Sequence, residues 1–589
     1  MRLPRPSPSA QVSAALALAS CLVACASEPL IAESPCPPAP KNVAPVATTP
    51  PKAEANPTRT LEVRLAPTRD GGAEVVAIDV SMRFSVPPVD FGEARPLVFR
   101  LDETRVEDVD ELAARDAEGS LALVRNEGDG KDTSAPAAWR AERRARGPVT
   151  VSYTRKLPAA GAASAAAPLS GSAGGFVGLG RAFLLVPETT EPHLMRVRWD
   201  VTGLGEGTSG ASSLGAGNVE WSGSPTALAA ATWAAGSLHR VTIERPAARE
   251  GEGASFAVTS LGRGVFDVVD AAAWSSRAWL SVGPLSEAPL GHFDVFLRSS
   301  GKTGRRFDAS VSGRSAIAVG DEGVTFGWPE KRVLARAMVR AGLGYTVDGA
   351  RWFDEGFVSY LAVDALRRAE LVAPAELLSE LETRATRYFS SAEVQGEDRG
   401  MLFAAELDAR IRAKSSGKRS LADVLRELTP KVAEGEAVAS GPRRVPEAAL
   451  REAITKELGA EGESRFAAVI SKASAAPEVP DDAFGPCFVK VKKKLPRYEL
   501  GFDPASATEK KVRGLSPKSA AARAGLAEGD RITAADLGDG TIDRPVEVEV
   551  DRGGKLTKLR WLPRGENVDG FSFAVGPKAP ASCGAARGR

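Results

Sequence analysis

The chain has 589 residues, more than one hydrophobic core supports, so we expect several domains. Its 76 basic and 75 acidic residues leave a formal charge of +1, which gives no reason to expect a nucleic-acid partner. The chain has three histidines, His193, His239 and His292, and no two of them lie within five residues of each other. A metal site built on two histidines one helical turn apart is therefore excluded.

The N-terminus has the features of a targeting signal, which we assign to residues 1–25. Arg2 and Arg5 precede an apolar run, Val12 to Leu22, that is too short to span a bilayer. The run leads into Leu-Val-Ala-Cys at 22–25, which resembles the lipobox of bacterial lipoproteins, where the cysteine becomes the lipidated first residue. The alternative is an ordinary cleaved signal peptide. The resemblance implies a membrane anchor at Cys25 in the bacterial cell envelope, and Ala26 after the cysteine favours the outer membrane.

Residues 26–58 are rich in Pro, Ala and Ser and predict a disordered tether. Short alternating runs between turn residues, such as 61–65 and 149–153, predict an N-terminal β-sandwich-like domain over 59–238. A low-complexity stretch, Ala159 to Gly175, predicts a disordered insertion within it. More strands are expected up to about Gly320, including 240–244, 256–259 and 292–297.

The pattern becomes helical after Pro329, a residue that suits a first helical turn. Helical spacing over Lys331 to Arg340 ends at Gly342 and Gly344. Further helices are predicted after Asp354 and over 374–388, 399–413, 420–428 and 446–458. The second domain, residues 239–480, therefore has strands followed by helices, and the chain as a whole is predicted to be an α+β multidomain protein.

Two arginines stand one helical turn apart, Arg332 and Arg336, and 18 residues separate Arg336 from Glu355. This is the spacing of a gluzincin zinc site, in which HExxH supplies two imidazoles and the general base and a later Glu is the third ligand. Guanidinium groups repel a dication, and Val333 at the position of the base cannot accept a proton. The segment keeps the spacing of the zinc site and has lost all but one of its functional side chains.

This motif, at the junction of a β part and a helical part, resembles the glycyl aminopeptidase family. These gluzincins have an N-terminal β domain, a thermolysin-like catalytic domain and a C-terminal PDZ domain. The resemblance covers nearly all of the mature chain and includes the run 352–357 and the stretch 399–421. It implies zinc and aminopeptidase activity, but residues 304–308 lack the edge-strand Glu of the family. The family also has a pair of tyrosines that would stabilise an oxyanion, and Gly396 and Glu397 stand there in this chain.

Residues 484–575 resemble a PDZ domain, with a signature over 516–532, and residues 576–589 form a tail. Leu500, Gly501 and Phe502 lie where the carboxylate-binding loop of a PDZ domain would be. The segment between Ile532 and Val546 is too short and too rich in glycine for a groove helix. We therefore expect a structural or docking module more than a peptide-capturing one.

Cys487 and Cys583 flank the PDZ-like region, and an envelope compartment permits a disulfide between them, which the sequence leaves open. For Glu355 we expect a salt bridge to Arg332, Arg336 or both in place of a metal. The alternative is a residual ligand for another ion.

The sequence thus predicts a lipid-anchored, non-catalytic binding or scaffold protein with metallopeptidase architecture and no cofactor. Its expected partners are the membrane, through Cys25, and other envelope proteins or peptides. One alternative is a zinc-dependent aminopeptidase that acts on peptides with unconventional ligands. Another is a folded surface lipoprotein whose cleft and PDZ-like groove do nothing.

Overall fold

The computed structural model describes residues 59–72, 74–85, 97–101, 109–126, 137–158, 167–172, 174–189, 191–245, 254–262, 265–286, 290–391, 396–429, 443–580 and 583. Cys25, the tether at 26–58 and residues 159–166 lie outside the described residues, so what was predicted for them stays a prediction. The rest of the predicted disordered insertion is wrong, because Leu169–Ser172 form a strand that pairs with its neighbour. Within the described residues, no helix is both long enough and apolar enough to cross a membrane.

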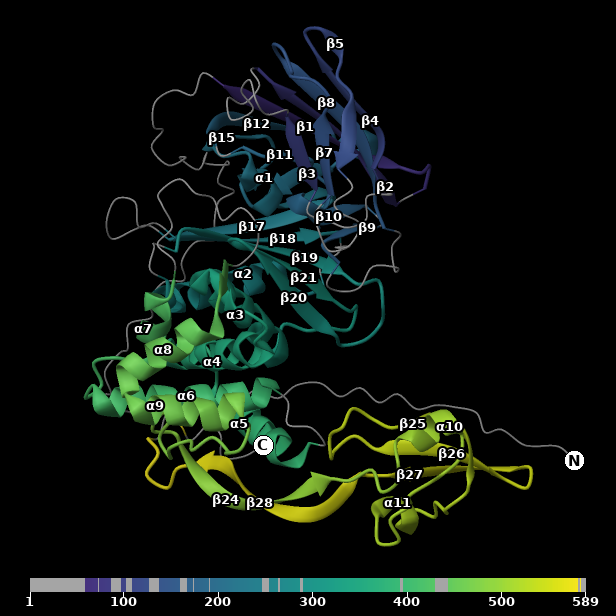
Figure 1. Ribbon diagram of the computed structural model, residues 1–589, viewed down its shortest axis with the longest axis vertical. Helices are drawn as coiled ribbons and strands as arrows, with labels where there is room; N and C mark the ends of the chain where they lie inside the picture. Colours follow the sequence, from purple (N-terminus) through teal and green to yellow (C-terminus); the bar gives the residue numbers. More distant parts are fainter. Residues whose placement is uncertain are drawn as a thin grey trace, which may run out of the picture. The chain divides into compact units, whose positions relative to one another are not determined.

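In its described residues, the N-terminal part contains three sheets (Figure 1), with strand orders β15-β12-β1-β2-β8-β4-β5, β14-β13-β16-β10-β9 and β11-β3-β7-β6. Strand β1 shows why they form: Leu61, Val63 and Leu65 are fully buried and alternate with exposed charged residues, so one face of the strand joins the core. Side chains from all three sheets share that core.

The elements of this part, in chain order, are β1 (Thr60–Arg69), β2 (Val75–Phe84), β3 (Val98–Leu101), β4 (Val109–Asp116), β5 (Gly119–Ser120), β6 (Leu123–Asn126), β7 (Ala137–Ala141), β8 (Val149–Lys156), β9 (Leu169–Ser172), β10 (Gly175–Leu179), η3 (Gly180–Ala182), β11 (Val186–Pro187), β12 (His193–Trp199), η4 (Thr202–Leu204), β13 (Ser209–Ser212), β14 (Gly215–Ala216), β15 (Val219–Gly223), α1 (Thr226–Ala230) and β16 (Thr232–Gly236).

A five-stranded sheet with the order β17-β18-β19-β21-β20 begins the next part. Its strands are β17 (Leu238–Arg245), β18 (Ala254–Leu261), β19 (His292–Ser299), β20 (Phe307–Ser312) and β21 (Ser315–Gly320). Strands β18, β19 and β21 are parallel, and the outer strands β17 and β20 are antiparallel to their neighbours. The helix α2 (Val268–Ser281) connects β18 to β19, as a parallel crossover requires.

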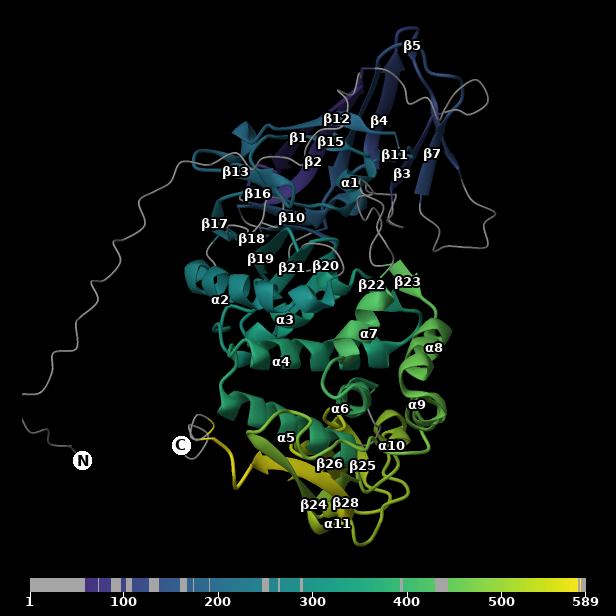
Figure 2. The same ribbon diagram turned by 90° about the vertical axis from the view of Figure 1, so that its left-hand side faces the viewer.

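Helices cover one face of this sheet and continue the same core (Figures 1 and 2). They are joined by two short paired strands, β22 (Tyr345–Val347) and β23 (Arg443–Val445). The helical elements are η5 (Gly283–Leu285), α3 (Trp328–Leu343), the π-helical turn η6 (Trp352–Phe357), α4 (Val358–Arg368), α5 (Pro374–Ser390), α6 (Gly396–Lys414), α7 (Leu421–Glu427), α8 (Glu447–Leu458), α9 (Ala460–Phe466) and the π-helical turn η7 (Ala467–Ser471).

The mixed α and β multidomain architecture predicted from the sequence is confirmed, with local corrections. Helix α2 lies where only strands were predicted, and α9 was not predicted. Gly342 is still helical, and it is Gly344, with φ of 68°, that ends α3. Helix α8 begins at Glu447, one residue after the proline that was predicted to open it.

The C-terminal part has its own small core. A long antiparallel ribbon, β24 (Phe488–Tyr498) with β28 (Arg564–Val575), begins in the helical core through Phe488 and Phe573. The remaining elements are α10 (Ala505–Glu509), α11 (Ala520–Arg523) and the sheet β25 (Arg531–Asp536), β26 (Val546–Arg552) and β27 (Lys555–Trp561). Cys487 and Cys583 form a disulfide with a Cα–Cα distance of 5.4 Å, which ties the C-terminal tail to the start of the ribbon.

Candidate functional site

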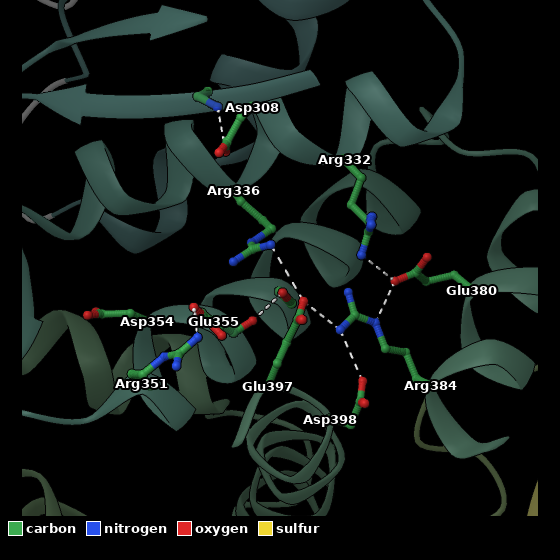
Figure 3. A network of polar contacts seen from close by, with 12 residues as sticks. Asp308, Arg332, Arg336, Arg351, Asp354, Glu355, Glu380, Arg384, Glu397 and Asp398 are labelled. Atoms are coloured by element: carbon green, nitrogen blue, oxygen red, sulfur yellow. Dashed lines mark hydrogen bonds and ion pairs between the residues drawn. The ribbon is translucent and has the colours of Figure 1, made fainter. Parts of the chain in front are cut away.

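Arg332 and Arg336 lie on α3, with both guanidinium groups on the same side of the helix (Figure 3). The helix is held at its start by Glu330, whose carboxylate accepts a hydrogen bond of 3.0 Å from the N–H of Gly327. The two arginine side chains are 23% and 19% exposed, so both charged groups are largely removed from water. Such groups need carboxylate partners.

Glu355 lies in the turn η6, but it does not supply that carboxylate. Its ion-pair partner is Arg351, at 3.2 Å, and its side chain is 32% exposed. The predicted salt bridge between Glu355 and Arg332 or Arg336 is therefore wrong, because carboxylates from two other helices reach these guanidinium groups. A half-exposed carboxylate keeps contact with water and does not require a buried cation.

The carboxylates that do pair with the motif arginines come from α5 and α6 (Figure 3). Glu380 accepts a hydrogen bond of 2.9 Å from Arg332, and Glu397 lies 3.5 Å from Arg336. Arg384, whose side chain is 1% exposed, lies between them, at 2.7 Å from Glu380 and 2.5 Å from Glu397. The five side chains form one continuous chain of ion pairs under α3.

Two further residues complete this chain. Asp398 is fully buried and lies 3.1 Å from Arg384. Arg387 contacts Asp398 at 3.0 Å and Glu397 at 3.3 Å. We call the seven residues the arginine–carboxylate network; its members are Arg332, Arg336, Glu380, Arg384, Arg387, Glu397 and Asp398.

The pKa values in the network follow from burial opposed by the neighbouring charges. Burial alone would raise the pKa of Glu397, but Arg384 and Arg336 outweigh it and lower the pKa to about 2. The pKa of Glu380 is lowered for the same reason, by Arg384 and Arg332. Burial lowers the pKa of Arg336 to about 10, so the guanidinium is still cationic at neutral pH. Asp398 differs from the two glutamates, because burial raises its pKa in spite of Arg384 and Arg387.

The residues at this position do not fit zinc. Two guanidinium groups occupy the positions of the imidazoles, have no lone pair to donate and repel a dication. Val333 offers no base, and Glu355 alone is not a ligand set. Among the described residues, no group of three or more His, Cys, Asp or Glu side chains is arranged to hold a metal ion.

The other departures predicted from the family resemblance can be placed in the fold. Residues 304–308 lead into β20, which is the edge strand of the five-stranded sheet. Asp308 is exposed there and accepts a hydrogen bond from the N–H of Ala309. Glu397, near the predicted tyrosine position, lies in the first turn of α6. Its carboxylate points at Arg336 and Arg384, so this position carries a negative charge that balances arginine.

The network residues on α5, among them Glu380 and Arg384, were not predicted from the sequence. The sequence did contain a signal: on the predicted helix 374–388, both lie on the same face as Leu377 and Leu381, which form the buried stripe. A charged pair four residues apart within an apolar stripe indicates a buried ion pair. Which other helix supplies the remaining partners cannot be read from that spacing.

In the C-terminal part, Leu500 and Phe502 are buried in its core, and Gly501 has a φ of 91°. A Cβ on Gly501 would lie 2.6 Å from Cβ of Ser519, so the loop is packed closely against the start of α11. The element that follows this loop is the helix α10, whereas in a PDZ domain a strand would follow it. Residues 537–545, all of them described, connect β25 to β26 without a helix. A peptide would find here neither the strand nor the helix that line a PDZ groove.

No protein-family model and no curated protein sequence matches the chain. Its fold is similar to the crystal structure of an aminopeptidase N family protein from Idiomarina loihiensis, with a TM-score of 0.57 and 15% identity over 89% of this chain and 99% of that one. The M1 zinc metallopeptidase from Deinococcus radiodurans has a TM-score of 0.43 and 15% identity over 72% of this chain and 95% of that one, too low to carry an argument. The first similarity shows that this chain shares the fold of the aminopeptidase N family protein.

Proposed function

We propose that this protein is a non-catalytic, lipid-anchored member of the metallopeptidase-like architecture and that it acts in the bacterial envelope as a binding or scaffold protein. The observation that carries the proposal is the pairing of Arg332 with Glu380 and of Arg336 with Glu397. Arg332 and Arg336 stand where a gluzincin has its two zinc-binding histidines, and each arginine has its own carboxylate partner. The PDZ-like module, which lacks a groove helix, serves as a structural or docking element in this proposal.

Metal analysis tests the loss of catalysis. The purified full chain, dialysed against zinc and washed, is expected to retain far less than one zinc per chain and to release no amino acid from Ala-Ala-Ala. The variants Glu355→Ala and Asp354→Ala, a matched neighbouring carboxylate, are expected to have the same low zinc content. Stoichiometric zinc that is lost in Glu355→Ala and kept in Asp354→Ala would establish the alternative, an aminopeptidase with unconventional ligands.

Membrane fractionation tests the anchor. The wild-type chain is expected to stay with membranes after a carbonate wash and Cys25→Ser to be released, because acyl chains supply the binding free energy. Cys36→Ser is the matched control and is expected to stay with membranes. A Cys25→Ser chain that still sediments with washed membranes would contradict the lipoprotein assignment.

Affinity purification from envelope extract separates a binding protein from an inert surface lipoprotein. The wild-type chain is expected to enrich a reproducible partner, and the inert alternative predicts none. We expect the arginine–carboxylate network to determine part of that binding.

A further inference from the structure

The arginine–carboxylate network is one negative charge short. Its seven side chains, all of them described, are four guanidinium groups and three carboxylates. With every group ionised, they carry a net charge of +1. Of the other charged side chains drawn in Figure 3, Glu355 is paired with Arg351, Asp354 accepts a hydrogen bond from Thr346, and the exposed Asp308 forms no ion pair with a described residue. A buried excess charge is costly unless an ion of opposite sign approaches it.

The excess is located at Arg336. Of the described residues, only Glu397 lies within ion-pair distance of it, at 3.5 Å, and that carboxylate is shared with Arg384 and Arg387. The buried Nε of Arg336 has no hydrogen-bond partner among the described residues, and neither has the Nε of Arg332. Figure 3 shows one terminal nitrogen of Arg336 directed at Glu397 and the other directed away from it.

An unsatisfied guanidinium selects its ligand by shape and charge. Its planar N–H groups match the two oxygens of a carboxylate, which can bind through two parallel hydrogen bonds. A carboxylate carries the single negative charge that the network lacks. A phosphate group carries about two, and it would lie close to the carboxylates of Glu397 and Glu355. The charge balance therefore favours a monoanion.

We propose that Arg336, assisted by Arg332, binds a carboxylate group of a ligand at the position where a gluzincin holds zinc. The inference rests on the proposed function, because a bound zinc ion and the cationic side chain of Arg336 cannot share this position. The carboxylate comes from the C-terminus of a peptide or from an Asp or Glu side chain. The metal site has in this view become an anion site, in a protein that binds ligands and does not cleave them.

Isothermal titration calorimetry of the full chain with three matched peptides tests this. Acetyl-Ala-Ala-Ala has a free C-terminus, acetyl-Ala-Glu-Ala-amide has only a side-chain carboxylate, and acetyl-Ala-Ala-Ala-amide has neither. We expect one of the first two peptides to bind and the third not to bind. Which of the first two binds shows whether the carboxylate comes from a C-terminus or from a side chain. Binding is expected to weaken with added salt. Equal binding of all three peptides, no binding of any, or tighter binding of inorganic phosphate would overturn the proposal.

Three substitutions locate the site. Arg336→Gln is expected to weaken binding about 10-fold or more, the range for a lost charge-assisted hydrogen bond. Glu397→Gln removes the carboxylate that competes for Arg336 and is expected to tighten binding, a gain that loss of folding cannot imitate. Arg444→Gln is the matched control at an exposed pair and is expected to bind as wild type does. Unchanged affinity in Arg336→Gln together with unchanged or weaker affinity in Glu397→Gln would refute the site.

The outcomes separate the two proposals. Stoichiometric zinc in the purified chain would overturn the proposed function and this inference together. A zinc-free chain that binds none of the three peptides would overturn the carboxylate site and leave the non-catalytic assignment in place.

Discussion

Replacing Arg384 by methionine is the sharpest test of the arginine–carboxylate network. Its guanidinium is 1% exposed and contacts Glu380, Glu397 and Asp398 at 2.7, 2.5 and 3.1 Å. Methionine has a similar length and no charge, so Arg384→Met leaves three buried carboxylates with fewer cations. Breaking a buried pair by removing one partner costs about 3–5 kcal/mol.

The pKa of Glu397 gives an independent magnitude. It is lowered from 4.5 to about 2, first by Arg384 and then by Arg336, against the effect of burial. The shift corresponds to about 3 kcal/mol of stability at neutral pH. Because the folded-state pKa is depressed, this contribution is present above pH 4.5 and is lost as the pH falls through about 2. The difference between wild type and Arg384→Met is therefore expected to shrink over that interval.

Hydrogen exchange of the amides in α5 and α6 measures the loss of stability in the helices that carry the network. A single unfolding midpoint of a multidomain chain does not report on these helices alone. We expect Arg384→Met to lower the opening free energy of both helices at pH 7 and Arg444→Met, at an exposed pair, to leave it unchanged. Adding Glu397→Gln to Arg384→Met is expected to recover part of the loss. A loss below about 1 kcal/mol, or one that does not vary between pH 4.5 and 2, would refute the reasoning.

Two further predictions concern packing and the cross-link. A Cβ on Gly400 would lie 2.0 Å from the carbonyl oxygen of Trp352, whereas one on Gly396 would meet nothing closer than 3.5 Å. Thermal melting should therefore show Gly400→Ala destabilised by about 1–3 kcal/mol and Gly396→Ala unchanged; equal melting of the two would contradict the close approach of α6 and η6. The disulfide between Cys487 and Cys583 spans 96 residues, so its reduction is expected to destabilise the C-terminal part by about 4 kcal/mol, measured by urea unfolding with and without dithiothreitol; identical midpoints would contradict this.

Local periodicity was enough to predict most of the helical part. Residues 374–388 and 399–413 carry apolar side chains at helical spacing, and α5 and α6 contain both ranges. Helix α2 was missed although Val268, Ala271, Ser275 and Trp279 are buried at helical spacing, and strands flank it on both sides. Its N-cap, Asp267, accepts hydrogen bonds from the N–H groups of Val269 and Asp270, which is a signal that the sequence did contain.

The candidate site also has features that the sequence predicts and features that only the packing determines. That Arg332, Val333 and Arg336 cannot hold or activate zinc follows from side-chain chemistry and holds for any packing. The error over Glu355 arose because the sequence places it at the distance of a third ligand, yet ion pairs form with the carboxylate that packing brings nearest. That carboxylate comes from α5 for Arg332 and from α6 for Arg336.

The sequence by itself therefore determined the class of architecture and the inability of Arg332, Val333 and Arg336 to hold or activate zinc, because periodicity and the identity of donor atoms are local properties. Only the tertiary structure decided how the arginines are neutralised, since Glu380 and Glu397 lie 48 and 61 residues further along the chain from the arginines that they contact. Buried charge has to be balanced in three dimensions, and that balance, one carboxylate short at Arg336, appears only when α3, α5 and α6 are packed together.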